Sequence, residues 1–217
     1  CLLGHYITKD DNNKTITVHD SYPQDIVSRA VHVFRDPMDN IVARFHLLQK
    51  EYVRTNQTEK IAMYPSSKEG FRAFCKHMDK QFIMGEHYKE EVAAEVYEDL
   101  IGIVKHVPCH ADFFRYIQWH NHAFTTTRDL NLPTMILHYE NYTTNFNETT
   151  DMLLEFLDKD CINEPPLFVT GKTYREYFTE KEIVAVSVMF SKLGSNETWD
   201  HTEHYLASKR RVLSGFF

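Results

Sequence analysis

The hydrophobic and polar positions of the chain repeat with two periods, one typical of strands and the other of helices. Residues 30–34 (AVHVF) form a β-branched and aromatic run that predicts a buried strand. Behind it, helical spacing separates the apolar residues Met38, Ile41, Val42, Phe45 and Leu48. Asp36 can cap this helix, and Pro37 suits its first turn because proline lacks only an N–H that would have no partner there. The segment is therefore predicted to be a strand, a tight turn and a helix.

The same two periods continue along the chain. Helices are predicted over about 68–80, 86–105 and 111–127, and a second strand over 134–139 is followed by a helix over 147–157. Residues 179–182 have the form of a capping box that opens a last helix, which Gly194 can end. Alternating strands and helices predict an α/β fold with a central, mainly parallel sheet flanked by helices. Ligands of such sheets bind beyond the carboxyl ends of the strands, which is where Arg35 lies.

Composition limits the class of protein. A chain of 217 residues with 42% hydrophobic and 13% aromatic residues is globular, and its length suits one domain over residues 1–217. With 24 Lys+Arg against 31 Asp+Glu, the net charge is -7, which argues against a nucleic-acid partner. No apolar run approaches the roughly 18 residues that span a bilayer. Because the sequence begins with Cys1, we expect a fragment or a processed chain, with any membrane anchor upstream.

Cysteines and glycosylation sequons bear on the cellular compartment. The four cysteines lack CxxC spacing and leave the redox compartment open. Five of the eleven asparagines lie in Asn-x-Ser/Thr sequons, whereas about 1.4 are expected by chance; they are Asn13, Asn56, Asn141, Asn147 and Asn196. The excess favours the Golgi or another secretory-pathway lumen. Accidental clustering in Thr-rich loops, with a cytoplasmic location, is the alternative.

Three segments share their order with one enzyme family. Residues 31–47 (VHVFRDPMDNIVARFHL) resemble the strand and helix that bind the 3′-phosphate in sulfotransferases that use 3′-phosphoadenosine 5′-phosphosulfate (PAPS). Trp119-His120-x-x-Ala123 with residues 132–157 is similar to a second family segment, and residues 168–182 (FVTGKTYREYFTEKE) resemble the cofactor-capping loop. The resemblance implies a P-loop-NTPase-like sulfotransferase core that is incomplete at its N-terminus.

The resemblance also assigns residues and an activity. It implies that Arg35 binds the 3′-phosphate, that Gly171 and Lys172 belong to the loop closing over the nucleotide, and that Glu140 is a strand-end carboxylate of structural role. The complete protein would transfer a sulfonate from PAPS to a hydroxyl or amine of a carbohydrate, protein or small molecule, without a metal. Its partners would be PAPS and this acceptor, for example a glycan.

Two departures from the family pattern qualify this activity. The family usually has a serine eight residues after the arginine, where its hydroxyl donates to the same phosphate, and this chain has Ala43. The sequence also contains no Gly/Ser/Thr-rich loop with a Lys or Arg for the 5′-phosphosulfate. Such donors stabilise the charge that develops on the leaving phosphate, so we expect residues 1–217 alone to be inactive. The alternative function is a non-catalytic, lumenal sulfotransferase-like module that binds a nucleotide or a glycan.

Other chemistries are less well supported by the sequence. A Walker motif ending in Gly171-Lys172-Thr173 would need glycine where the chain has Pro166. For the catalytic base, the only histidines upstream of the arginine strand are the weak candidates His5 and His19, unless the base precedes Cys1.

Histidines also raise the question of a metal site. Five potential ligands lie close together in sequence, namely His106, Cys109, His110, His120 and His122. However, Pro108 interrupts the first group, and His120 and His122 diverge on a helix, so no metal is predicted. We expect His120 to pack between its helix and the sheet.

Overall fold

The computed structural model describes residues 3–9, 15–21, 27–87, 94–163, 168 and 171–207, with the backbone alone for 3–9, 15–21, 83–87 and 94–97. Strands β1 (Leu3–Lys9) and β2 (Thr15–Ser21) form an antiparallel hairpin, and β3 (Ala30–Phe34) pairs in parallel with β4 (Thr134–His138). The longer helices are α1 (Pro37–Arg54), α3 (Lys68–His87), α4 (Ala94–Val104), α5 (His110–Asp129), α7 (Phe146–Leu157) and α8 (Glu180–Leu193). The shorter ones are α2 (Thr58–Met63), α6 (Asn141–Thr144), α9 (Asn196–Asp200) and α10 (Glu203–Leu206), with a 3-10 turn at Arg175–Tyr177.

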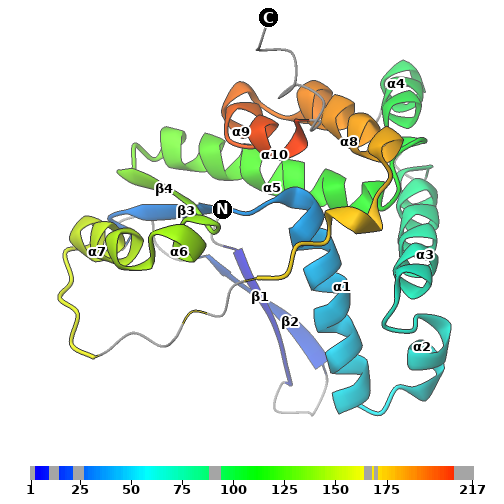
Figure 1. The fold of residues 1–217 in the computed structure, drawn as a ribbon, viewed down its shortest axis with the longest axis horizontal. Helices are drawn as coiled ribbons and strands as arrows, with labels where there is room; N and C mark the ends of the chain where they lie inside the picture. Colours follow the sequence, from blue (N-terminus) through cyan, green and yellow to red (C-terminus); the bar gives the residue numbers. More distant parts are fainter. Residues whose placement is uncertain are drawn as a thin grey trace, which may run out of the picture.

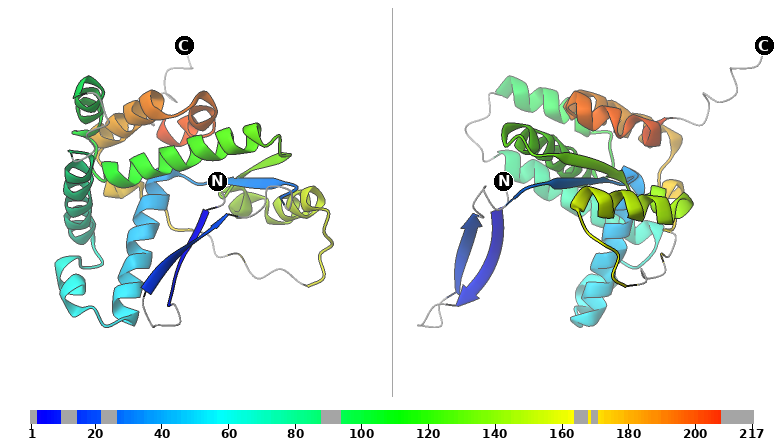
Figure 2. Two further views of the ribbon diagram at one scale, coloured as in Figure 1. Left: turned by 180° about the vertical axis from the view of Figure 1, so that it is seen from behind. Right: turned by 90° about the vertical axis from the view of Figure 1, so that its left-hand side faces the viewer.

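Helices cover both faces of the β3–β4 sheet (Figures 1 and 2). Helix α5 runs along one face, with α8, α9 and α10 beyond it, and α6 and α7 lie on the other face. The α/β class and the parallel pairing are confirmed, but within the described residues the sheet has two strands only. Helix α1 descends from the carboxyl end of β3 and packs beside α3. The turn that joins β3 to α1 therefore lies between the sheet and these helices.

The turn between β3 and α1 forms as the sequence predicts. Asp36 is the N-cap of α1, and its Oδ1 accepts hydrogen bonds from the backbone N–H groups of Met38 at 2.8 Å and Asp39 at 3.3 Å. Pro37 occupies the first turn, where its missing N–H has no consequence. The apolar positions Met38, Ile41, Val42 and Phe45 are buried in the core. These contacts fix the direction in which the chain leaves β3.

Several element boundaries differ from the prediction. Helix α3 continues to His87 rather than ending near residue 80, and α4 begins at Ala94 rather than near 86, with residues 88–93 outside the description. The capping box of Thr179 and Glu182 is confirmed, and Gly194 is the C-cap of α8. The hairpin β1–β2 and helices α2, α9 and α10 are additional elements that periodicity did not indicate.

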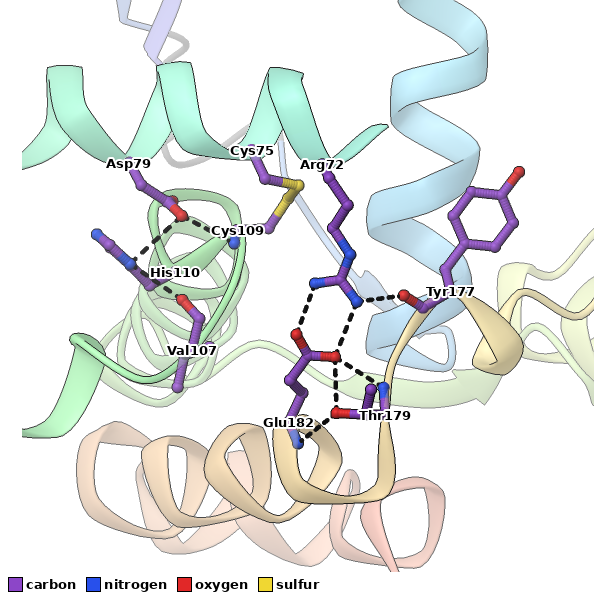
Figure 3. Close-up of polar contacts among 9 residues, drawn as sticks. All are labelled: Arg72, Cys75, Asp79, Val107, Cys109, His110, Tyr177, Thr179 and Glu182. Carbon is purple, nitrogen blue, oxygen red and sulfur yellow. Dashed lines mark hydrogen bonds and ion pairs between the residues drawn. A yellow bond between two sulfur atoms is a disulfide. The ribbon is translucent and has the colours of Figure 1, made fainter. Parts of the chain in front are cut away.

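An arginine joins α3 to the start of α8 (Figure 3). The two Nη atoms of Arg72 donate to the two carboxylate oxygens of Glu182, each at 2.8 Å, and Nη2 also donates to the carbonyl of Tyr177. Glu182 Oε2 in turn accepts from the N–H and the hydroxyl of Thr179. A bidentate pair of this kind fixes orientation as well as distance. The capping box therefore also serves as a contact between helices distant in sequence.

A disulfide joins α3 to the residue preceding α5 (Figure 3). Cys75 and Cys109 are bonded across 34 residues, and both are buried. Beside them, the carboxylate of Asp79 accepts hydrogen bonds from the N–H groups of Cys109 at 2.9 Å and Ala111 at 3.0 Å. Asp79 thus satisfies two donors at the N-terminus of α5, as a capping side chain would. The disulfide is compatible with the expected lumenal location.

We predict that this disulfide contributes substantially to stability. Replacing it by Cys75→Ala and Cys109→Ala should lower the free energy of unfolding by about 2–4 kcal/mol, because the cross-link restricts the unfolded chain. Urea titration followed by circular dichroism measures the change.

The matched control is Cys161→Ser, because Cys161 is an exposed free thiol and its replacement should leave the urea midpoint unchanged. The same midpoint for the double alanine variant and the oxidised wild type would show that the bond contributes nothing.

Candidate functional site

The backbone at the carboxyl end of β3 is held from two sides. The hydroxyl of Tyr116, on α5, donates to the carbonyl of Arg35 at 2.8 Å. The next N–H, that of Asp36, donates to Oε1 of Glu140 at 2.9 Å. Both polar groups of the peptide that joins Arg35 to Asp36 therefore have side-chain partners. The direction of the Arg35 side chain is fixed by elements other than its own strand.

Glu140 extends this network to the C-terminal helices. Its Oε2 accepts a hydrogen bond from the hydroxyl of Tyr205 at 2.5 Å, and that hydroxyl also lies 2.8 Å from Nδ1 of His138. Burial, followed by the hydrogen bond to the carboxylate, raises the pKa of Tyr205 above its usual value. Tyr205 thus remains a neutral donor. This gives Glu140 the structural role that the resemblance implied.

The guanidinium of Arg35 has unused hydrogen-bonding capacity. Its carbon lies 4.7 Å from the centre of the Tyr139 ring, and among the described residues it forms no ion pair and no hydrogen bond. In particular, it does not pair with Asp39, which instead accepts a hydrogen bond from the N–H of Tyr174 at 2.5 Å. The Nε atom of Arg35 is buried and has no hydrogen-bond partner among the described residues. Buried arginine donors usually have an acceptor, so this side chain is suited to an anionic ligand.

The segment 171–174 lies against this arginine. A Cβ placed on Gly171 would be 3.5 Å from Nη2 of Arg35 and 3.6 Å from the Tyr139 ring, so this segment runs directly beside the guanidinium. Lys172 is exposed and lies near His46 of α1. Burial is the main cause of the lowered pKa of His46, and the charge of Lys172 is the second. The structure therefore places Gly171 directly beside Arg35, whereas Lys172, the next residue, is exposed and interacts with His46 of α1.

A cavity of about 400 Å³ opens beside Arg35 and Tyr139. It is also lined by Arg44 of α1 and by Asp112, Arg115 and Trp119 of α5. Three arginines face one carboxylate there, since Arg35 belongs to the same lining, whereas the whole chain carries a net charge of -7. The cavity is thus a local positive site on an acidic protein. A second cavity, of about 330 Å³, lies at the disulfide and contains none of the residues predicted from sequence.

Arg44, Asp112 and Arg115 were not predicted from the sequence as site residues, and Trp119 entered the prediction only as part of the second family segment. A signal was present in the predicted helix 111–127, because Asp112 stands in the otherwise apolar run ADFF and Arg115 follows at the i+3 position. A charged residue on the buried face of a helix normally requires a partner. Arg44 comes from a different helix, so its place beside Asp112 depends on tertiary packing.

A buried histidine pair lies between β3 and α5, next to the cavity. Nε2 of His32 and Nδ1 of His120 are 2.7 Å apart, and each residue is only 3% exposed. The His120 ring stacks on Phe34, with ring centres 4.1 Å apart. The packing of His120 between helix and sheet is thereby confirmed. Burial, with the nearby charge of other histidines, lowers the pKa of His32 to about 4 and that of His120 to about 3.

The two histidines proposed as weak candidates for the base and the five sequon asparagines remain to be placed. His5 and His19 are directly paired residues of the β1–β2 hairpin, and their side chains lie outside the description. Four sequon asparagines, Asn56, Asn141, Asn147 and Asn196, are exposed, and Asn13 is outside the described residues. Within the described ranges, no group of three potential metal ligands occurs, and no helix is long and apolar enough to cross a membrane.

We predict that acidification destabilises the protein through the His32–His120 pair. Because folding lowers both pKa values, the stabilisation is complete above the unfolded value of about 6.5 and is lost as the pH falls toward 4. Between pH 7 and pH 5 the free energy of unfolding should fall by roughly 2 kcal/mol or more. Asp36 acts in the opposite sense, since burial and then the charge of Asp39 raise its pKa to about 6, and its contribution is lost as the pH rises through that value.

The measurement is urea unfolding at several pH values. The double variant His32→Phe, His120→Phe should lose most of the pH dependence whatever its absolute stability, whereas His122→Gln, an exposed change on the same helix, should retain it. An unchanged pH slope in the double variant would contradict the assignment.

Comparison with known proteins leaves the site to be interpreted from its own geometry. No family model matches the chain, and no curated protein or solved structure matches it.

Proposed function

We propose that the chain is the 3′-phosphate-binding part of a PAPS-dependent sulfotransferase with a P-loop-NTPase-like core. The observation that carries the proposal is the Arg35 guanidinium, which lies at the carboxyl end of a parallel strand, forms no hydrogen bond or ion pair with the described residues and borders a cavity. Arginine binds phosphate in a bidentate manner, and ligands of parallel sheets bind at this edge. The similarity of residues 31–47, 132–157 and 168–182 to the family supports the same assignment.

The residues beside Arg35 suit a nucleotide. The guanidinium lies over the ring of Tyr139, and its planar fork suits a two-point contact with a phosphate. Gly171 leaves the space next to Nη2 without a side chain, and Lys172 adds a mobile point charge. PAPS would supply the sulfonate, and in this proposal the described residues bind and orient its 3′ end. The N–H groups at the start of α1 are already bound by Asp36, so Arg35 supplies the principal donors.

The second edge of β3 supports an incomplete core. Within the described residues β3 pairs with β4 alone, so its other edge has no strand partner there. Parallel sheets usually have both faces covered and more than two strands. In the proposed enzyme a further strand, carrying the loop for the 5′-phosphosulfate, would pair with this edge.

We predict that Arg35 provides most of the affinity for adenosine 3′,5′-bisphosphate, the product nucleotide. Arg35→Ala should weaken binding at least about tenfold, because a hydrogen bond to a charged group contributes about 1.5–3 kcal/mol. Titration calorimetry on residues 1–217 measures the loss.

Arg29 provides a matched control, because it precedes the same strand and its guanidinium lies over Phe156. Arg29→Ala should bind the nucleotide as wild type does, and Ala43→Ser should bind it more tightly by adding the hydroxyl that the family pattern contains. Equal affinity of wild type and Arg35→Ala would remove Arg35 from the site.

The absence of a phosphate loop from the sequence predicts that residues 1–217 bind the product nucleotide without transferring sulfonate. Labelled PAPS and a panel of hydroxyl and amine acceptors test this, and a chain extended upstream through such a loop should recover transfer. Turnover by residues 1–217 would show that another segment supplies the second anion site. Failure of every extended chain would favour the alternative, a non-catalytic lumenal module, which Ala43 also favours.

A further inference from the structure

The cavity beside Arg35 contains a second group of polar side chains that the nucleotide assignment does not use. Asp112 is almost fully buried, with a side chain 2% exposed, and its Oδ1 accepts from Nη1 of both Arg44 and Arg115, the latter at 3.1 Å. Its other oxygen, Oδ2, is buried and receives no hydrogen bond from the described residues. Because this oxygen is closed to solvent, Asp112 serves the cavity through Oδ1, which holds the two arginines.

The two arginines retain donors of their own. Each guanidinium has five N–H groups, and the bonds to Asp112 use one nitrogen of each. Their side chains are 43% and 49% exposed, so the remaining N–H groups face an accessible space. Because Asp112 fixes both guanidinium groups in one place, little further ordering is needed for an anion to bind. The pair is therefore a preorganised site for a carboxylate or sulfate group.

Trp119 adds an exposed aromatic surface. It lines the same cavity and is 58% exposed, an unusual position for the largest apolar side chain. It lies one turn beyond Arg115 on α5, so the indole and the guanidinium lie on the same side of the helix. An indole face packs against the C–H face of a pyranose ring, while its edge tolerates water. A sugar ring that carries an acidic group matches both the aromatic face and the anion site.

We propose that this group of residues binds an acidic carbohydrate, and that the acceptor of the sulfonate is a hydroxyl of such a sugar. Arg44 and Arg115, both held by Asp112, bind its carboxylate or sulfate, and Trp119 packs on the ring. The inference rests on the proposed function for the role of acceptor. Arg35 lines the same cavity, so nucleotide and sugar would meet there.

Calorimetry with a chondroitin tetrasaccharide, which contains uronic acids, tests the proposal on residues 1–217. Wild type should bind it at low salt and should not bind maltotetraose, a neutral sugar of equal length. Arg115→Gln should weaken binding about tenfold, and Trp119→Ala about fivefold. Neither change should alter the affinity for adenosine 3′,5′-bisphosphate.

Arg128→Gln is the matched control for charge. Arg128 lies on the same helix, is 63% exposed, pairs with Glu197 at 2.9 Å and does not line the cavity. Its replacement removes the same charge and should leave sugar binding unchanged. An equal loss for Arg128→Gln and Arg115→Gln would show general attraction to the anion and overturn the proposal.

The two titrations separate this inference from the proposed function. Nucleotide binding without tetrasaccharide binding would overturn the sugar site alone. Loss of nucleotide affinity in Trp119→Ala or Arg115→Gln, with sugar binding intact, would assign the cavity to the nucleotide and also overturn it. Tetrasaccharide binding with the expected variant pattern, but no nucleotide binding, would support the sugar site and overturn the sulfotransferase assignment.

Discussion

The carboxylate of Glu140 is the group on which the geometry of the site depends. One oxygen accepts from the N–H of Asp36 and the other from the hydroxyl of Tyr205, so a single side chain joins the end of β4, the start of α1 and the C-terminal helices. The hydroxyl of Tyr116 donates to the carbonyl of Arg35. Together, Glu140 and Tyr116 therefore bind both polar groups of the peptide that joins Arg35 to Asp36, so neither can turn toward water. The direction of the arginine is thus a property of the whole fold. Removing Glu140 would leave the N–H of Asp36 without its acceptor in a partly buried position.

Charge is distributed unevenly around this turn. The arginines of the cavity outnumber the single carboxylate among its lining residues. The histidine pair between β3 and α5 adjoins the same cavity, and because both histidines are buried and neutral at physiological pH, it adds no charge there. The charge of Arg35 interacts with that of Asp39 at the start of α1, which lies outside the cavity lining. An acidic chain can therefore present an anion site, because three of its arginines gather around one cavity.

The sequence predicted those parts of the fold whose chemistry is local. Asp36, Pro37 and the Thr179–Glu182 capping box specify helix starts within four residues, and the strand at 30–34 is a β-branched and aromatic run; all are confirmed. Of the residues predicted for the site, Gly171 lies beside Arg35, and their role in binding a nucleotide stays a prediction. The contacts of Arg44 with Asp112 and of Cys75 with Cys109 cross 68 and 34 residues, and no periodicity encodes which partners meet. The end of α3 and the start of α4 were misplaced by several residues. The helical spacing in this region contains no clear stop signal, so the boundary between the two helices could not be located from the sequence.

The disulfide also closes one segment of the chain into a covalent loop. This loop consists of the residues between Cys75 and Cys109, and it includes the end of α3 and all of α4. The disulfide fixes both ends of the loop beside the start of α5. A protease cut within this loop would leave two polypeptides still joined by the sulfur atoms. Arg72 on one piece would still pair with Glu182 on the other. The arginine cavity could therefore persist in a nicked chain, and only a reductant would separate the fragments.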